Sequence, residues 1–223
     1  MISKFRLTAL SIHLVCSIFV ITVVTAVSLF VWFPHPWYEI DGTFRALLIV
    51  FGVDIVIGPI LTLVVSNNKK SLRELLFDFS LILLLQLGAL GFGISELYKQ
   101  RVAAIVYLEG RFHLVPYSKV VDTDTTTYGE SYNGVAYGML RYLDFEGLDQ
   151  AGIEVMMSSP SEYRKLAALD LDQYPYAIEA VPETLLSKHG RGVYYRLVSG
   201  KNKNGIAVIN QDMQIIDIDV VHE

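Results

Sequence analysis

The sequence predicts an integral membrane protein, with three N-terminal transmembrane α-helices followed by a small α+β extracytoplasmic domain. Two observations lead to this fold class. The first 100 residues contain three apolar runs, at about 10–33, 46–65 and 75–97, and each is long enough to cross a hydrocarbon core of about 30 Å. Residues 101–223 instead have the mixed polarity of a soluble domain.

The charge distribution supports the same division into a membrane domain, 1–100, and a soluble domain, 101–223. Residues 1–101 carry eight Lys or Arg and six Asp or Glu, whereas residues 102–223 carry ten and seventeen. Nucleic-acid-binding domains present basic surfaces, so we expect no nucleic acid partner. The only cysteine, Cys16, lies in the first apolar run, and we expect it to be a small packing residue.

Basic residues beside the spans predict the orientation in the membrane. The first run exceeds the apolar core of a signal peptide, which has roughly 7 to 15 residues, so we expect it to be retained. The loop at 34–45 carries a single arginine, and the other basic residues near the first two spans are Lys4, Arg6, Lys69, Lys70 and Arg73. Because Lys and Arg favour cytoplasmic loops, we expect a multi-pass bacterial inner-membrane protein with a cytoplasmic N-terminus, contacts to membrane lipid, and a periplasmic C-terminal domain.

Asp54 lies near the middle of the second apolar run, where a carboxylate is costly and is usually functional or partnered. Counted at about 1.5 Å per residue, Gln86 in the third run lies at a similar depth. The Gln86 amide would then donate to Asp54 in a structural clasp. A proton relay and a docking point for another membrane helix are the alternatives. The relay is disfavoured because few other ionisable residues lie within the spans.

Small residues accompany these two polar side chains in the second and third spans. They are Gly58, Gly88, Ala89, Gly91 and Gly93, and residues of this size allow membrane helices to approach closely. Pro59 follows Gly58 and is expected to bend the second span, because proline has no N–H for the helical hydrogen bond.

Three segments resemble the core of the type IV pilin accessory proteins of the TfpX/TfpZ group. They read Phe-Gly-Val-Asp-Ile-Val-Ile-Gly-Pro-Ile-Leu-Thr-Leu-Val-Val at 51–65, Asn-Asn-Lys-Lys-Ser-Leu at 67–72 and Leu-Leu-Leu-Gln-Leu-Gly-Ala-Leu-Gly-Phe-Gly at 83–93. The resemblance covers roughly residues 5–120, and its most specific part is the Gly-Val-Asp…Gly-Pro-x-Leu-Thr-Leu block.

This resemblance implies a non-enzymatic inner-membrane factor that modulates type IV pilin assembly or pilus extension and retraction. It brings no catalytic residues, cofactor or metal. The implied partner is a major or minor type IV pilin, contacted at its transmembrane helix and its head, with self-association and other pilus-assembly proteins as further candidates. Asp54, Gly58, Pro59 and Gln86 occupy motif positions of this group. The candidates for interaction and packing are these four residues together with Thr62, Gly88 and Gly91.

The soluble domain shows strand and helix patterns that predict an antiparallel sheet with helices on one face. Alternating apolar residues at 102–108 and 112–116 flank a tight turn and indicate a hairpin. Helices are expected from about Pro160 and at 182–188. Three late strands are expected at about 193–198, 204–209 and 213–220, separated by turn residues.

Four tyrosines in this domain, Tyr128, Tyr132, Tyr137 and Tyr142, lie in a mostly polar stretch. Tyrosine provides amphipathic contact area at low entropic cost, so these residues are candidates for a protein-binding surface. The alternative is that they pack in the core of a β-rich domain.

Catalytic and metal-binding patterns are weak throughout the chain. In the soluble domain, the histidines His113, His189 and His222 are scattered, without the spacing of a metal site, and we expect them to be solvated. The acidic residues of the 122–130 loop lack the register of an EF-hand. No phosphate-binding loop or nucleophile elbow is present.

Two function classes therefore follow from the sequence. The first is the non-enzymatic pilin assembly factor, and the second is a membrane-anchored periplasmic ligand-binding or sensor protein. A sensor needs an output module, and the segments expected in the cytoplasm are short. This disfavours the second class.

Overall fold

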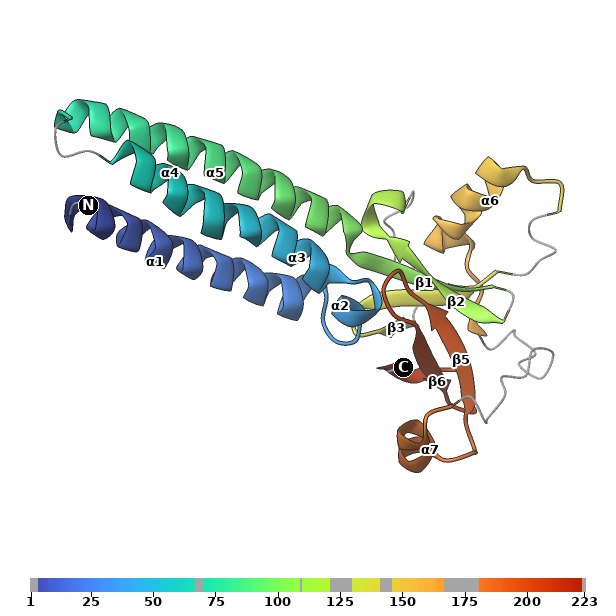
Figure 1. Ribbon diagram of the computed structural model, residues 1–223. Coiled ribbons are helices and arrows are strands. Elements are labelled where there is room, and N and C mark those ends of the chain that lie inside the picture. Colours follow the sequence, from blue (N-terminus) through green and yellow to red (C-terminus); the bar gives the residue numbers. More distant parts are fainter. Residues whose placement is uncertain are drawn as a thin grey trace. The chain divides into compact units, whose positions relative to one another are not determined.

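The computed structural model describes residues 4–66, 70–108, 110–120, 130–140, 146–166 and 181–221. The chain forms two compact units, which we call the helical unit and the sheet unit (Figure 1). The helical unit comprises Met1–Trp32 and Thr43–Tyr98, and the sheet unit comprises Phe33–Gly42 and Lys99–Glu223. The residues that connect the first two spans therefore belong to the sheet unit.

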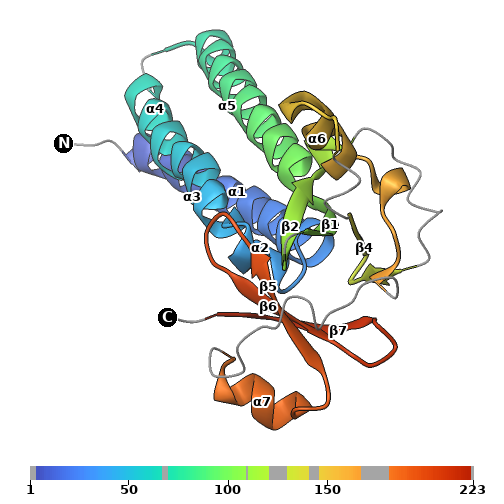
Figure 2. The ribbon, with the colours of Figure 1, turned by 90° about the vertical axis from the view of Figure 1, so that its right-hand side faces the viewer.

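The helical unit contains three helices that are long and apolar enough to cross a membrane, which confirms the three predicted apolar helices. They run lengthwise beside one another (Figures 1 and 2). Their bounds are α1 Lys4–Val27 with a π-helical turn Ser28–Trp32, then α3 Thr43–Gly52, a π-helical turn Val53–Ile57 and α4 Gly58–Val65, and finally α5 Leu72–Gln100.

Pro59 does not end the second helix. The π-helical turn Val53–Ile57 directly precedes α4, and Pro59 occupies the first turn of α4, where the missing N–H is tolerated. A π-helical turn of this kind interrupts an α-helix locally and is frequent at functional sites. Asp54 lies in this turn.

The three helices pack through a small apolar cluster. Leu47 and Phe51 of α3 and Leu97 of α5 are buried together, with side chains of α1 packed against them. Gly93 of α5 permits the close approach, because a Cβ atom placed there would lie 2.8 Å from Val50 Cγ1. Gly88 and Gly91 have no atom within 4 Å of the equivalent position, so they do not contribute to packing within this unit.

The sheet unit contains one seven-stranded sheet with the order β3-β4-β1-β2-β5-β6-β7. The strands are β1 Val102–Leu108, β2 Arg111–Pro116, β3 Ser131–Tyr132, β4 Val135–Met139, β5 Tyr194–Ser199, β6 Gly205–Ile209 and β7 Ile215–Val220. The purely antiparallel sheet expected from the sequence is wrong, because β1 pairs with β4 and β2 pairs with β5 in parallel. Parallel neighbours need long crossover connections, and residues 117–193 separate β2 from β5.

Two helices cover one face of this sheet, and only the second of them, α7, lies where the sequence predicted a helix. Helix α6 Gln150–Met157 packs its apolar side chains against Ala104 and Val106 of β1. Helix α7 Glu183–His189 packs Leu185 against β5 and β6. The helix expected from Pro160 is only a 3-10 turn, Pro160–Glu162, since Arg164 then exchanges backbone hydrogen bonds with Met139. Helix α6 was not predicted.

The other face of the sheet encloses the main core, and part of that core comes from the connection between the first two spans. Trp37 and Ile40 of α2, Trp37–Ile40, are 1% and 0% exposed among residues of six strands. The β5–β6 turn holds this segment, because the Asn202 N–H and Nδ2 donate to the carbonyls of Ile40 and Glu39 at 3.1 Å each. Lys201 pairs with Asp41 at 2.9 Å.

Two tyrosines, one on β3 and one on β4, form hydrogen bonds to β7 at the opposite edge of the sheet. The sheet curls from β4 round to β7 (Figure 2), and the Ile218 N–H donates to Tyr132 Oη at 3.2 Å while the Ile215 N–H donates to Tyr137 Oη at 3.4 Å. Tyr132 donates in turn to Asp217 Oδ1 at 3.3 Å. These bonds occupy N–H groups of β7, an edge strand that would otherwise be able to pair with another chain.

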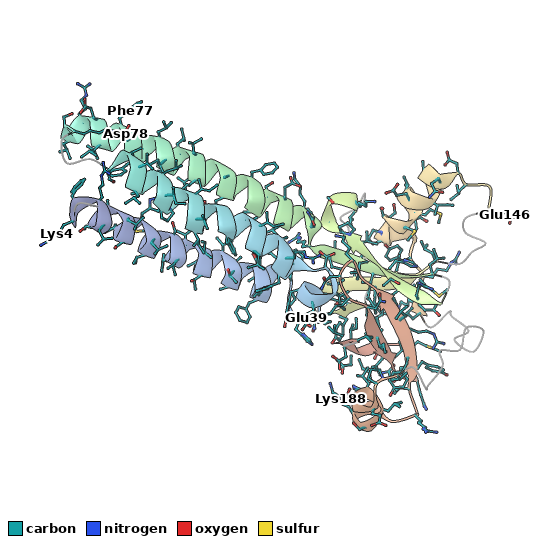
Figure 3. The ribbon with its side chains drawn as sticks, viewed as in Figure 1. Lys4, Glu39, Phe77, Asp78, Glu146 and Lys188 are labelled. Carbon is teal, nitrogen blue, oxygen red and sulfur yellow. The ribbon has the colours of Figure 1, made fainter. Side chains whose placement is uncertain are left out.

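Helix α7 adds two further partners to Asp217. Lys188 and His189 approach Asp217 Oδ2 at 2.6 and 2.8 Å, and Figure 3 labels Lys188 on α7. His189 is therefore not the solvated histidine that we expected. Burial acts to raise the pKa of Asp217, but the hydrogen bonds from Lys188 and His189 outweigh it and hold the pKa below its ordinary value.

Replacing Trp37 by Ala should destabilise the sheet unit, although Trp37 lies between the first two spans. Removal of a buried aromatic side chain costs about 3–5 kcal/mol. Pulse proteolysis of the full-length protein in detergent, with cleavage within the sheet unit monitored as a function of urea concentration, measures the change in stability. Exposed Val155 on α6 provides the control variant Val155→Ala. An unchanged urea midpoint for Trp37→Ala would show that the connection is not part of this core.

The stability of the sheet unit should fall at acid pH because of Asp217. An aspartate whose folded pKa is lowered contributes stability above its unfolded pKa of about 3.9, and that contribution is lost as the pH falls through the lower folded value. Urea midpoints at neutral pH and below about pH 4 should differ less in Asp217→Asn than in the wild type. Glu146→Gln, at an exposed carboxylate, should retain the wild-type difference.

Two glycines of α5 should respond differently to substitution by alanine. Gly93→Ala places a methyl group against the stiff side chain of Val50, and overpacking of this kind costs about 1–3 kcal/mol. Gly91→Ala meets open space and should be neutral or slightly stabilising, because alanine is the better helix former. Thermal denaturation of both variants in detergent compares them, and equal midpoints would contradict the packing described above.

Candidate functional site

The motif residues of the second span share one buried face. Asp54, Gly58 and Thr62 are spaced four residues apart and are all buried, and Pro59 is buried beside them. A spacing of four places side chains above one another on a helix. The structure thus brings these sequence candidates together on the side of the second span that faces the interior of the helical unit.

Gln86 of α5 and His13 of α1 meet this face from the other two helices. A Cβ atom at Gly58 would overlap Gln86 Nε2 and lie 2.8 Å from His13 Nε2, so the glycine provides the room for both side chains. His13 Nδ1 lies 2.7 Å from Thr62 Oγ1. His13 was not among the sequence candidates. The signal that could have found it is its position as the only histidine of an otherwise uncharged first span.

Asp54 is 6% exposed, and its Oδ1 atom has no hydrogen-bond partner. Between described residues, no hydrogen bond joins Asp54 to Gln86, so the expected clasp is not formed. A buried acceptor without a partner costs about 1–3 kcal/mol or more. The Asp54 carboxyl therefore combines a buried, unsatisfied acceptor with a position in the lining of the groove described next.

A groove of about 510 Å³ runs between α1 and α5, with Asp54 and Thr62 of the second span at its base. Most of its lining is apolar and comes from one face of each outer helix, and His13 and Gln86 add polar groups. Cys16 also lines the groove and is exposed there, whereas we expected a packing residue. The volume lies within the range of about 300–1,000 Å³ typical of binding pockets.

The outward face of α5 carries the remaining membrane candidates. Gly88 and Gly91 are exposed, and so are Leu84 and Phe92 close to them in sequence. Together, these glycines and large apolar side chains form a surface that takes no part in the packing of the three helices. In this respect Gly88 and Gly91 differ from Gly58, which contacts the other helices.

Polar contacts fix the beginning of α5. Lys70 Nζ lies 2.6 Å from Asp78 Oδ2, and Ser71 and Glu74 form a capping box in which the Ser71 N–H donates to Glu74 Oε2 at 2.8 Å. Asp78 and Lys4 lie at the same end of the helical unit (Figure 3). Basic residues therefore gather at this end.

The tyrosine candidates lie in the sheet unit. Tyr137 is 4% exposed and Tyr132 is half-buried against Trp37, with ring centroids 6.4 Å apart. Tyr128 and Tyr142 lie outside the described residues, as do His222 and most of the acidic 122–130 loop. Over the described part of the chain, no group of three His, Cys, Asp or Glu side chains is arranged to hold a metal ion.

Comparison with known proteins gives consistent results at the level of the family. Residues 3–42 match the family described as Fimbrial assembly protein FimB. The chain is 38% identical over 96 residues to the "Fimbrial assembly protein, serogroups C1 and C2" of Dichelobacter nodosus. The aligned segment covers 43% of this chain and 73% of that protein. It has the same identity over 96 residues to the serogroup I protein of that organism.

The extent of these matches differs between the relatives. The chain spans only 37% of the length of the serogroup I protein and of the serogroup E1 protein. No solved structure matches the chain. The serogroup C1 and C2 relative is matched over most of its length, and on this basis the chain belongs to the fimbrial assembly protein family.

Proposed function

We propose that this protein is a non-enzymatic accessory factor of the bacterial inner membrane that modulates type IV pilin assembly, or pilus extension and retraction. The observation that carries the proposal is the 38% identity over 96 residues with fimbrial assembly proteins. The motif at 51–65 adds the finer resemblance to the TfpX/TfpZ group of pilin accessory proteins. The three apolar helices are consistent with a role in the membrane.

The orientation proposed for the protein places the N-terminus in the cytoplasm and the sheet unit in the periplasm. Basic residues at one end of the helical unit support it, since Lys4 begins α1 at the end where Lys70 pairs with Asp78 (Figure 3). Lys and Arg accumulate on the cytoplasmic side of membrane proteins. With three crossings, the sheet unit then lies on the opposite side.

The proposed partner is a major or minor type IV pilin, contacted in the membrane and at its head. Association of helices within lipid relies on close packing at small residues and on hydrogen bonds between helices. The helical unit offers both, because Gly88 and Gly91 are exposed on α5 and Asp54 retains an unpartnered acceptor in the groove. Large apolar side chains are also exposed along all three spans.

Deleting the gene should change the number or length of surface pili several-fold while pilin remains in the membrane, and the wild-type gene should restore them. A photocrosslinking amino acid at Phe30, Ile49 or Leu84, one exposed position in each span, should capture pilin in intact cells. An unrelated inner-membrane protein should not be captured. Unchanged pili together with no pilin capture from any span would contradict the proposed function.

A further inference from the structure

The groove between α1 and α5 is built as an incomplete helix-packing site. The helices pack through Leu47, Phe51 and Leu97, and none of these residues lines the groove. The two walls consist instead of apolar side chains repeated at helical spacing, such as Ile12 and Cys16 on α1 and Leu83 and Leu87 on α5. The exposed side chains Ile12, Leu83 and Leu87 are 56–61% accessible, so no described residue of the chain covers these walls.

The polar groups at the base of the groove indicate the chemistry of the missing partner. Asp54 is buried with Oδ1 unpaired, so this position calls for a hydrogen-bond donor. His13 is already directed to Thr62, and the Gln86 amide lies against Gly58. The complementary surface is therefore apolar along its length, with one donor group opposite Asp54.

The depth of Asp54 discriminates between a lipid and a protein helix. Asp54 lies midway between Thr43 and Val65, the ends of the second span, and is thus roughly 16 Å from either end at 1.5 Å per residue. Lipid headgroups stay at the borders of a hydrocarbon core about 30 Å thick, and an acyl chain has no donor to offer at its middle. A transmembrane helix can place a hydroxyl, amide or amine at this depth.

We propose that the groove binds one apolar transmembrane helix of a partner protein, with a donor side chain of that helix hydrogen-bonded to the Asp54 carboxyl group, which lines the groove. Under the proposed function, on which this inference rests, that helix is the membrane segment of pilin. The walls of α1 and α5 contact its apolar side chains, and Asp54 fixes its depth and rotation. The chain then contributes three helices to a four-helix arrangement.

Cys16 provides a native reporter of occupancy, because it is the only cysteine and lines the groove. Alkylation of Cys16 by a membrane-permeable maleimide should be several-fold slower in membranes that contain pilin than in membranes from a pilin deletion strain. The matched control is Val15→Cys in a Cys16→Ser background. Val15 is 66% exposed one residue away and does not line the groove, so its labelling should not depend on pilin.

Bismaleimide crosslinking from Cys16 to single cysteines scanned along the pilin helix should give products at one helical face. Asp54→Asn keeps an acceptor oxygen and should retain the crosslink, whereas Asp54→Leu should lower its yield roughly 3- to 10-fold, as expected for the loss of one hydrogen bond between helices in a membrane. Immunoblots and unchanged labelling at the Val15 position control for protein amount and folding.

Several outcomes would overturn the groove proposal. These are pilin-independent labelling of Cys16, equal crosslink yields from both Asp54 variants and the wild type, or a Cys16–Cys16 product, which would identify a second copy of the chain as the occupant. Pilin captured from Leu84 on the outward face of α5 while Cys16 stays unprotected would also overturn it. That last result would leave the proposed function standing, whereas the absence of pilin capture and of any pilus phenotype would remove both.

Discussion

The ten residues between the first two spans are held in the core of the sheet unit, and the organisation of the chain depends on this connection. Burial of Trp37 and Ile40 among the strands means that the core is completed by residues that precede the sheet by more than 60 positions. The chain consequently passes between its two units three times. The sheet unit is therefore not one continuous segment of the chain, since its core includes residues from the connection between the first two spans.

Within the helical unit, the residues that pack the three helices together are different from the residues that line the groove. Leu47, Phe51 and Leu97 pack the helices, whereas the groove contains the costly polar groups. Lipid is as apolar as leucine, so burial of apolar surface does not by itself select a partner helix. In the complex that we propose, the buried Asp54 carboxylate supplies that selection, because only a helix with a donor at the right depth offsets the cost of its unsatisfied acceptor.

The sheet unit shows how the tyrosines of a polar stretch can serve the fold. Tyr132 and Tyr137 close the curled sheet by accepting hydrogen bonds from β7. The β3–β4 hairpin that places them turns at Asn133 and Gly134, both with positive φ. Asn-Gly between two strand-forming segments is a strong hairpin signal, so this hairpin could have been predicted from the sequence, although our sequence analysis did not include it.

The sequence by itself determined the three apolar helices, the late strands β5, β6 and β7, and the residues of the site on the second span, because hydrophobic periodicity and a local motif are properties of neighbouring residues. Only the tertiary structure decided the parallel pairing of β1 with β4, the burial of Trp37, the meeting of His13 with Thr62 and the unpartnered Asp54. Each of these depends on contacts between residues far apart in the chain. Depth along a span placed Asp54 level with Gln86, but the rotation of each helix decided that they would line a groove instead of bonding to each other.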